Sequence, residues 1–147
     1  MSVSASIDIS ILKNNIYNFS AKDLIAIMIN NNWDVKKEDK VCYLPLGDNL
    51  FEWTEKNISY SELMELVTQK EENSETIGLI LYWKNTNIGV SMLIFDNLQV
   101  SFNITMNRRR LKSVRNMDIT DINWYVQKII NCFDKFKVTE ITFNQVW

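Results

Sequence analysis

Hydrophobic and polar positions alternate most regularly between residues 76 and 106, and this pattern predicts three consecutive β-strands. The strands are expected at 76–84, 88–95 and 98–106, separated by short turns rich in Asn and Asp. Alternating runs bounded by such turns are typical of an antiparallel meander. One face carries the large apolar side chains and is expected to be a core. The other mixes Gly, Ser and Asn with a few apolar residues and is expected to be partly exposed.

Three more strands are predicted outside the meander. Residues 3–11 alternate strictly between apolar residues and Ser or Asp, which predicts a half-buried strand at a sheet edge, with a frayed tail as the alternative. A short strand at 41–46 is expected to end near Pro45, because proline cannot donate to a central ladder. Residues 138–147 predict a closing strand with Ile141 and Phe143 on one face.

Three helices follow from helical spacing and capping residues. Ser20 and Ser59 are each followed by an acidic residue three positions later, which approximates a capping box and predicts helices at 20–32 and 59–69. The third helix is expected to be capped by Asp118 or Thr120, and its apolar residues follow the i, i+3, i+4 rule through residue 133.

The order of these elements is β, α, β, α, β, β, β, α, β. Their total length of 147 residues suits a single domain, and no internal repeat or linker divides the chain. This order implies a single α+β domain, in which an antiparallel sheet with a central meander packs one face against two or three helices. The identity of the strands that flank the meander stays open.

Composition excludes most catalytic machinery. The chain has no histidine, three glycines and two cysteines, so triads, zinc sites, a Walker loop and a dinucleotide fingerprint cannot be assembled. We therefore expect no cofactor, no metal and no enzymatic activity. Glu71, Glu72 and Glu75 are the remaining candidates for acid–base work, and Cys132 for a nucleophile. A solvated acidic loop and a core thiol are the favoured interpretations of these residues.

The chain contains no apolar run long enough to span a membrane, and its first residues lack the pattern of a secretory signal. A cytoplasmic protein that binds no membrane is expected. Cys42 and Cys132 are then expected to be reduced and buried rather than joined in a disulfide.

Charge is distributed unevenly along the chain. Residues 58–106 carry six acidic against two basic side chains, and residues 107–147 carry eight basic against four acidic ones. The densest basic cluster is Arg108, Arg109 and Arg110 with Lys112 and Arg115. It would suit phosphate contacts, but a pI near 5.2 favours a structural role in which the arginines pair with acids of the second helix. No direct nucleic-acid partner is expected.

The acidic side chains of and after the second helix form the candidate partner-binding surface, with a solubilising helix face as the alternative. An exposed aromatic residue in the preceding loop is added, because aromatic residues anchor protein interfaces. The candidate residues are Glu62, Glu65, Glu71, Glu72, Glu75 and Trp53.

Several of these elements together resemble the immunity proteins of bacterial contact-dependent growth-inhibition systems. The resemblance lies in the capped helix 20–32 followed by Trp33 and a short strand, in the meander, and in the segment 121–130 followed by the closing strand. It implies a cytoplasmic protein that binds the toxic C-terminal domain of a delivered effector, often a nuclease, and covers its active site or substrate groove. No family site can be carried onto numbered residues of this chain.

Three other functions stay open. A secretion chaperone or adaptor that binds an effector segment is the main alternative, and an obligate dimer in solution would favour it. An enzyme using only carboxylates or a thiol, and a nucleic-acid module using residues 108–110, are the others. For the immunity protein we expect a monomer in the free state.

Overall fold

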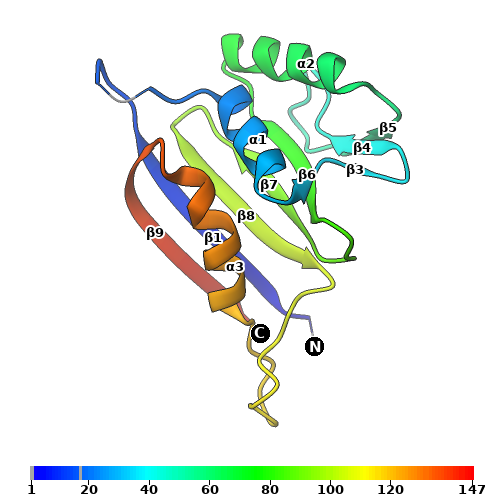
Figure 1. The fold of residues 1–147 in the computed structure, drawn as a ribbon, viewed down its shortest axis with the longest axis vertical. Coiled ribbons are helices and arrows are strands. Elements are labelled where there is room, and N and C mark those ends of the chain that lie inside the picture. Colours follow the sequence, from blue (N-terminus) through cyan, green and yellow to red (C-terminus); the bar gives the residue numbers. More distant parts are fainter. Residues whose placement is uncertain (1, 17) are drawn as a thin grey trace.

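A single antiparallel sheet and three α-helices make up the computed structural model, which describes residues 2–16 and 18–147 (Figure 1). The strands are β1 (Ser4–Leu12), β2 (Trp33–Asp34), β3 (Lys36–Lys37), β4 (Lys40–Tyr43), β5 (Thr54–Lys56), β6 (Ile77–Trp83), β7 (Gly89–Ile94), β8 (Gln99–Met106) and β9 (Lys137–Val146). The helices are α1 (Ala21–Asn30), α2 (Tyr60–Glu72) and α3 (Ile122–Ile130), and α3 continues into a 3₁₀ turn at Asn131–Phe133. The α+β class and the central meander are confirmed.

The strands follow the order β3-β4-β6-β7-β8-β1-β9, with β2 paired to β6 and β5 paired to β4. The edge position predicted for the N-terminal strand is wrong, because β1 pairs with β8 on one side and with β9 on the other. Alternation reports that one face of a strand is buried, but it does not report how many of its edges are paired. The closing strand β9 takes the edge instead.

The apolar face of the sheet forms one core with all three helices. Leu24, Ile25 and Met28 of α1 and Ile129 of α3 are at most 1% exposed, and they belong to the same cluster as the meander's apolar residues. In Figure 1, α1 and α3 lie over the same face of the sheet. The opposite face therefore keeps the partly exposed character that its Ser, Asn and Gly residues predicted.

Both predicted helix starts are confirmed by their caps. The Ser20 hydroxyl accepts a hydrogen bond from the backbone N–H of Asp23 at 3.4 Å, and the Ser59 hydroxyl accepts one from Glu62 at 3.1 Å. These bonds satisfy N–H groups that have no partner within the helix.

The cap predicted for the third helix is wrong. Asp121 occupies that position and makes no side-chain capping bond. The two expected caps are bound to Arg108 instead: its guanidinium donates to the Asp118 carboxylate at 2.6 Å and to the Thr120 hydroxyl at 3.0 Å. A charge-assisted bond to arginine is stronger than a neutral one, and here it takes both side chains away from the helix end.

Of the nine strands in the part of the chain that the structure describes, three are not predicted by the sequence: β2, β3 and β5. Each has only two or three residues. A period of two cannot be recognised over so short a run, so these strands are visible only through their pairing.

Gly78 lies in β6 where a loop crosses the uncovered face of the sheet. A Cβ at this position would lie 2.5 Å from Leu44 Cγ and 3.0 Å from Trp53 Cη2. Leu44 is only 1% exposed, so it has little room to move. The glycine therefore lets the 44–53 loop approach the sheet.

We expect Gly78→Ala to lower the free energy of unfolding by roughly 1–3 kcal/mol, because the added methyl overpacks the contact with Leu44 and Trp53. Urea unfolding followed by tryptophan fluorescence measures this. Gly47→Ala is not a matched control, because Gly47 has a positive φ of 79°. Ser91→Ala, on the same face of β7, is the control and should change stability by less than about 0.5 kcal/mol. Equal stability of Gly78→Ala and the parent protein would contradict the close approach.

Candidate functional site

The structure divides the five candidate glutamates into two groups. Glu62, Glu65, Glu71 and Glu72 are all exposed along α2, but the carboxylates of Glu71 and the half-buried Glu75 accept hydrogen bonds from backbone N–H groups elsewhere in the chain, which separates them from Glu62, Glu65 and Glu72. Within the first group, the Glu62 carboxylate bonds only inside its own helix cap, accepting from the Ser59 hydroxyl at 3.2 Å, so these three remain the candidates for a partner surface.

Glu71 serves as a cap for another helix. Its Oε2 atom accepts a hydrogen bond from the backbone N–H of Ala21, the first residue of α1, at 2.8 Å. A carboxylate at a helix N-terminus satisfies an unpaired donor and interacts favourably with the helix dipole. Glu71 therefore joins α2 to the start of α1.

Glu75 and Lys70 fasten the loop that follows β4. Lys70 is fully buried, and its ammonium donates to the carbonyls of Leu44 at 3.1 Å and Pro45 at 2.8 Å. Glu75 lies 3.8 Å from this ammonium and accepts a hydrogen bond from the backbone N–H of Gly47 at 2.7 Å. Burial lowers the pKa of Lys70, and the charges of nearby acids oppose that shift.

Trp53 lies apart from the exposed glutamates. It is 36% exposed, as expected for a loop tryptophan, but its ring packs over Gly78 on the face of the sheet opposite the helices. The structure therefore does not bring Trp53 together with α2.

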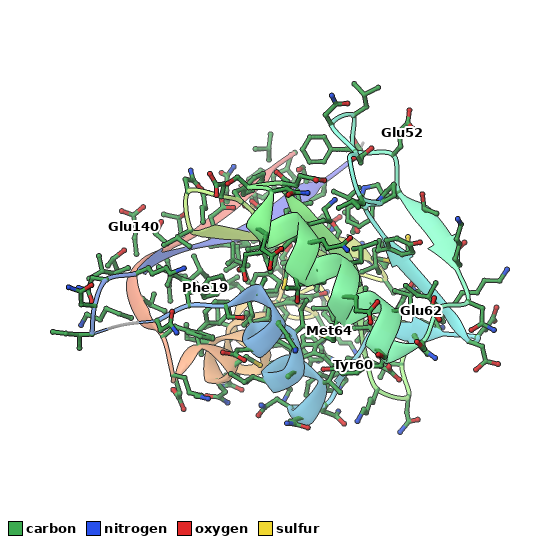
Figure 2. The ribbon with its side chains drawn as sticks, turned by 90° about the horizontal axis from the view of Figure 1, so that it is seen from above. Phe19, Glu52, Tyr60, Glu62, Met64 and Glu140 are labelled. Carbon is green, nitrogen blue, oxygen red and sulfur yellow. The ribbon has the colours of Figure 1, made fainter. Side chains whose placement is uncertain are left out.

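The exposed side of α2 borders a shallow groove beside α1. Figure 2 shows the two helices next to each other, with Tyr60, Glu62 and Met64 near the beginning of α2. The groove has a volume of about 540 Å³ and is lined by Lys22, Tyr60, Ser61, Met64, Glu65, Thr68, Gln69 and Glu72. Residues 61, 65, 68 and 72 follow helical spacing, so they form one continuous stripe along α2.

Tyr60 is a surface residue that sequence reasoning missed. Its side chain is 43% exposed beside Met64, which is 6% exposed. A tyrosine next to a helix cap is indistinguishable by pattern from a core aromatic. By spacing it belongs to the apolar stripe of Leu63, Met64 and Val67, and only its position in the first turn, one residue after Ser59, could have signalled exposure.

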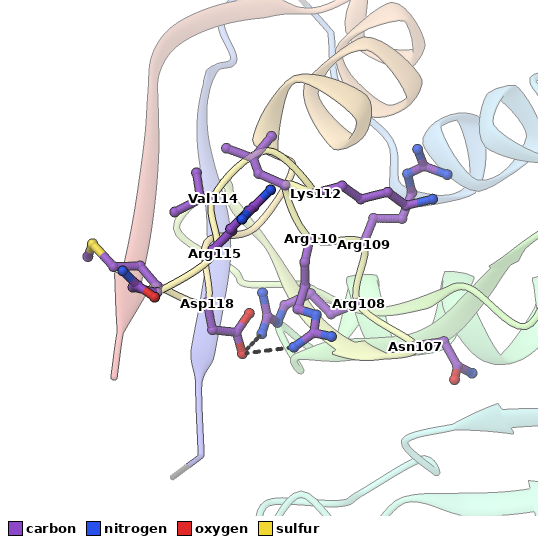
Figure 3. Close-up of a pocket in the computed structure, with 11 residues that line it drawn as sticks. Asn107, Arg108, Arg109, Arg110, Lys112, Val114, Arg115 and Asp118 are labelled. Atoms are coloured by element: carbon purple, nitrogen blue, oxygen red, sulfur yellow. Dashed lines mark hydrogen bonds and ion pairs between the residues drawn. The ribbon is translucent and has the colours of Figure 1, made fainter.

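The basic segment 107–118 folds into a loop beyond the end of the sheet, with its arginine side chains spread around a hollow of about 680 Å³ (Figure 3). The predicted pairing with the acids of the second helix is wrong. Arg108 and Arg110 lie 2.6 and 3.8 Å from the Asp118 carboxylate, and Arg109 lies 3.7 Å from Asp121. The bond from Arg108 holds the pKa of Asp118 below its ordinary value.

The base of this loop is attached to a cluster of tryptophans. Trp33, Trp83 and Trp124 make edge-to-face contacts with centroids 5.2–6.4 Å apart. Arg109 lies 5.2 Å from the Trp124 ring, and its backbone N–H donates to the Tyr125 hydroxyl at 2.8 Å. These contacts support the structural interpretation of two of the arginines.

The two cysteines are free thiols, as expected for a reduced protein. Cys132 is fully buried, and burial raises its pKa to about 11. Cys42 is half-buried, so the expectation that both thiols are buried is wrong for it, and burial raises its pKa as well. Within residues 2–16 and 18–147, no cluster of three or more His, Cys, Asp or Glu side chains is arranged to hold a metal ion. In the same part of the chain, none of the helices has the length and apolar character needed to cross a membrane.

We expect the raised pKa of Cys132 to reduce stability at alkaline pH. The unfolded thiol ionises near pH 8.5 and the folded one near 11, so the unfolded state loses its proton first and the free energy of unfolding falls between these values. At pH 10 the loss is roughly 1–2 kcal/mol. Urea unfolding at pH 7 and pH 10 measures it, and Cys132→Ala, which keeps Lys70 and the tyrosines, should show a shallower fall. Identical slopes would rule out this contribution.

Adjacent glutamates on α2 provide a matched test of the two groups. We expect Glu71→Ala to lower the free energy of unfolding by about 1 kcal/mol, because it removes the cap of α1. Glu72→Ala removes the same charge one residue later and should change stability by less than about 0.5 kcal/mol. Urea unfolding of both variants is the measurement, and equal losses would show that Glu71 has no capping role.

Comparison with known proteins adds no relative to this description. No protein-family model matches the sequence, and no curated protein or solved structure shows significant similarity to it. The function is therefore inferred from the surfaces described above.

Proposed function

We propose that this protein is an immunity protein that binds a cognate toxin domain and neutralises it by covering the toxin's active site or substrate groove. The observation that carries the proposal is the exposed stripe on α2, where Glu65 and Glu72 line the groove shared with α1 and Glu62 is exposed on the same helix. The resemblance of the sequence elements to immunity proteins supplies the class of partner.

The charge of the stripe suits a toxin that acts on nucleic acid. A nuclease must attract phosphates, so its substrate groove is positive, and carboxylates on an inhibitor compete for the same field. None of the three glutamates makes a salt bridge within the described residues. Their charges therefore remain available to steer and hold a basic surface.

Tyr60 supplies the apolar part of the same surface. Tyrosines beside a shallow groove are frequent binding hot spots, because a rigid ring covers a large area at a small entropic cost. Tyr60 lies at the N-terminal end of the stripe and Glu72 at the C-terminal end, 12 positions apart. At about 1.5 Å per residue, the contact would run along roughly 18 Å of helix.

Three charged side chains at the C-terminal end of α2 keep this surface in place. Glu71 caps α1, and Lys70 and Glu75 fasten the 44–48 loop, all from the last turns of α2 or just after it. A surface held in its binding conformation loses less entropy on association. This rigidity favours recognition of one cognate partner.

A secretion chaperone or adaptor is the second candidate. The observation that favours it is the sheet edge at β9, where Ile141 and Phe143 are about 40% exposed. An effector segment bound there would not depend on the charges of α2. Charge reversal on α2 therefore separates the two functions.

We expect Glu65→Lys and Glu72→Lys each to weaken binding of the cognate toxin domain by about tenfold or more, and to reduce the salt dependence of the affinity. Tyr60→Ala should cost about 2 kcal/mol of binding energy. Titration calorimetry at two salt concentrations measures both quantities.

Glu52→Lys is the matched control, because it makes the same charge change on the loop far from Tyr60 and Glu62 (Figure 2). It should leave both affinity and salt dependence near the parent values. Unchanged binding of all α2 variants would remove this surface from the proposal.

A further inference from the structure

The two ends of the sheet are protected in different ways. At one end, β3 has two residues, both lysines, its partner β4 adds Lys40, and β5, which also pairs with β4, adds Lys56. At the other end, β9 has ten residues, and none of the described strands pairs with its outer side. Short strands and lysines keep an edge from pairing with other chains, so only the β3 end has this protection.

The sequence of β9 favours pairing of this edge with another strand, and its second half contains none of the features that prevent it. Residues 141–147 contain no charge, no proline and no glycine. Exposed apolar side chains follow one another here: Ile141 is 42% exposed, Phe143 40%, Val146 54% and Trp147 51%. An uncharged, β-prone stretch on an open edge aggregates unless something specific covers it.

The side chains of β9 that face the helix side of the sheet, Ile141 and Phe143, form an apolar rim. Ile141 and Phe143 stand opposite the buried Ile9 and Ile7 of β1, and so they lie on the helix side of the sheet. Ile141 also borders a small crevice lined by Val126 and Ile130 of α3. The apolar core of the domain thus extends to β9, and no other described element covers its outer end.

We propose that β9 pairs antiparallel with β9 of a second copy of this chain, with Thr142 on the two-fold axis. In this register Ile141 faces Phe143 of the other copy, twice, and Glu140 faces Asn144 twice. Residues that face each other lie on the same side of the joined sheet, so the apolar rim of each copy covers that of the other.

Charge favours a second copy as the occupant. Within residues 140–144, this register places no charged side chain opposite another of the same sign. The basic loops also stay apart: each lies near Trp147, whose indole donates to the Asp118 carbonyl at 2.9 Å, five residues from the axis. The two-fold then sets the loops at opposite ends of the interface, roughly 30 Å from one another by strand rise.

This dimer departs from the monomer expected from the sequence, and it does not rest on the proposed function. The α2 stripe lies over the other end of the sheet, beside β6 and α1, and remains accessible in the dimer (Figure 1). A toxin could therefore bind each copy. A dimer paired through β9 would occupy the edge at which an effector segment was placed, so it counts against that form of the adaptor, and the α2 variants still separate the two functions.

The full chain tests the proposal by sedimentation equilibrium. We expect the parent protein to sediment at twice the 17.3 kDa chain mass. Thr142→Lys puts two like charges opposite each other and should raise the dimer dissociation constant by about tenfold or more. Thr142 is exposed on the uncovered face, so the monomer fold should keep its parent circular dichroism spectrum. Thr105→Lys, at an exposed position on the same face of β8, should leave the dimer intact.

A cysteine at the axis tests the register itself. Facing residues in an antiparallel pair have Cα atoms about 4.5–5.5 Å apart, which a disulfide can bridge. In a Cys42→Ser background, Thr142→Cys should form a covalent dimer under mild oxidation and Thr105→Cys should not. Monomeric parent protein at all concentrations would overturn the dimer. A stable dimer that Thr142→Lys leaves unchanged and Thr142→Cys does not cross-link would overturn this interface.

Discussion

The structure depends on one interaction: the helices all pack on the same face of a single sheet and bury its apolar side chains. Ile7, Leu81, Met92 and Phe102, from four adjacent strands, are at most 1% exposed beneath the helices. About 25 cal/mol is gained for each Å² of apolar surface removed from water, so this layer supplies most of the driving force for folding. The helices are consequently committed to one face. The remaining surfaces, namely the outer side of α2, the uncovered face and the β9 edge, are those available for function.

Charged side chains in this protein have two roles: some bond to the backbone and hold the fold together, and others stay exposed. Sequence alone does not distinguish these roles. Glu71 and Glu72 are adjacent residues of the same type, yet only Glu71 reaches the start of α1. Lys70 lies in a charged run and is nevertheless fully buried against carbonyl oxygens. A buried ammonium is stable there because its donors are satisfied by two carbonyls and by the nearby Glu75. The acidic surface is therefore smaller than composition suggests, but it is more precisely placed.

The elements with strong local signals could be predicted from the sequence. The meander, both serine caps and the buried character of Cys132 follow from periodicity and hydrogen-bonding chemistry that act within a few residues. The position of β1 inside the sheet and the pairing of Arg108 with Asp118 depend on contacts between distant parts of the fold or within an irregular loop, where no period exists. The open edge at β9 belongs to the same group, because an edge is defined by what is absent from its outer side.

The proposed function and the proposed dimer use surfaces at different ends of the sheet, and each can fail without the other. The central claim is that this chain neutralises a toxin domain by binding it. Co-expression in bacteria of this chain with the C-terminal domain of a large secreted effector, should one be found in the adjacent reading frame, and of that domain alone, tests that claim most directly. The account predicts growth only when the chain is present, together with a stable complex of the two proteins on purification. Unchanged growth arrest in the presence of folded, soluble chain would contradict it.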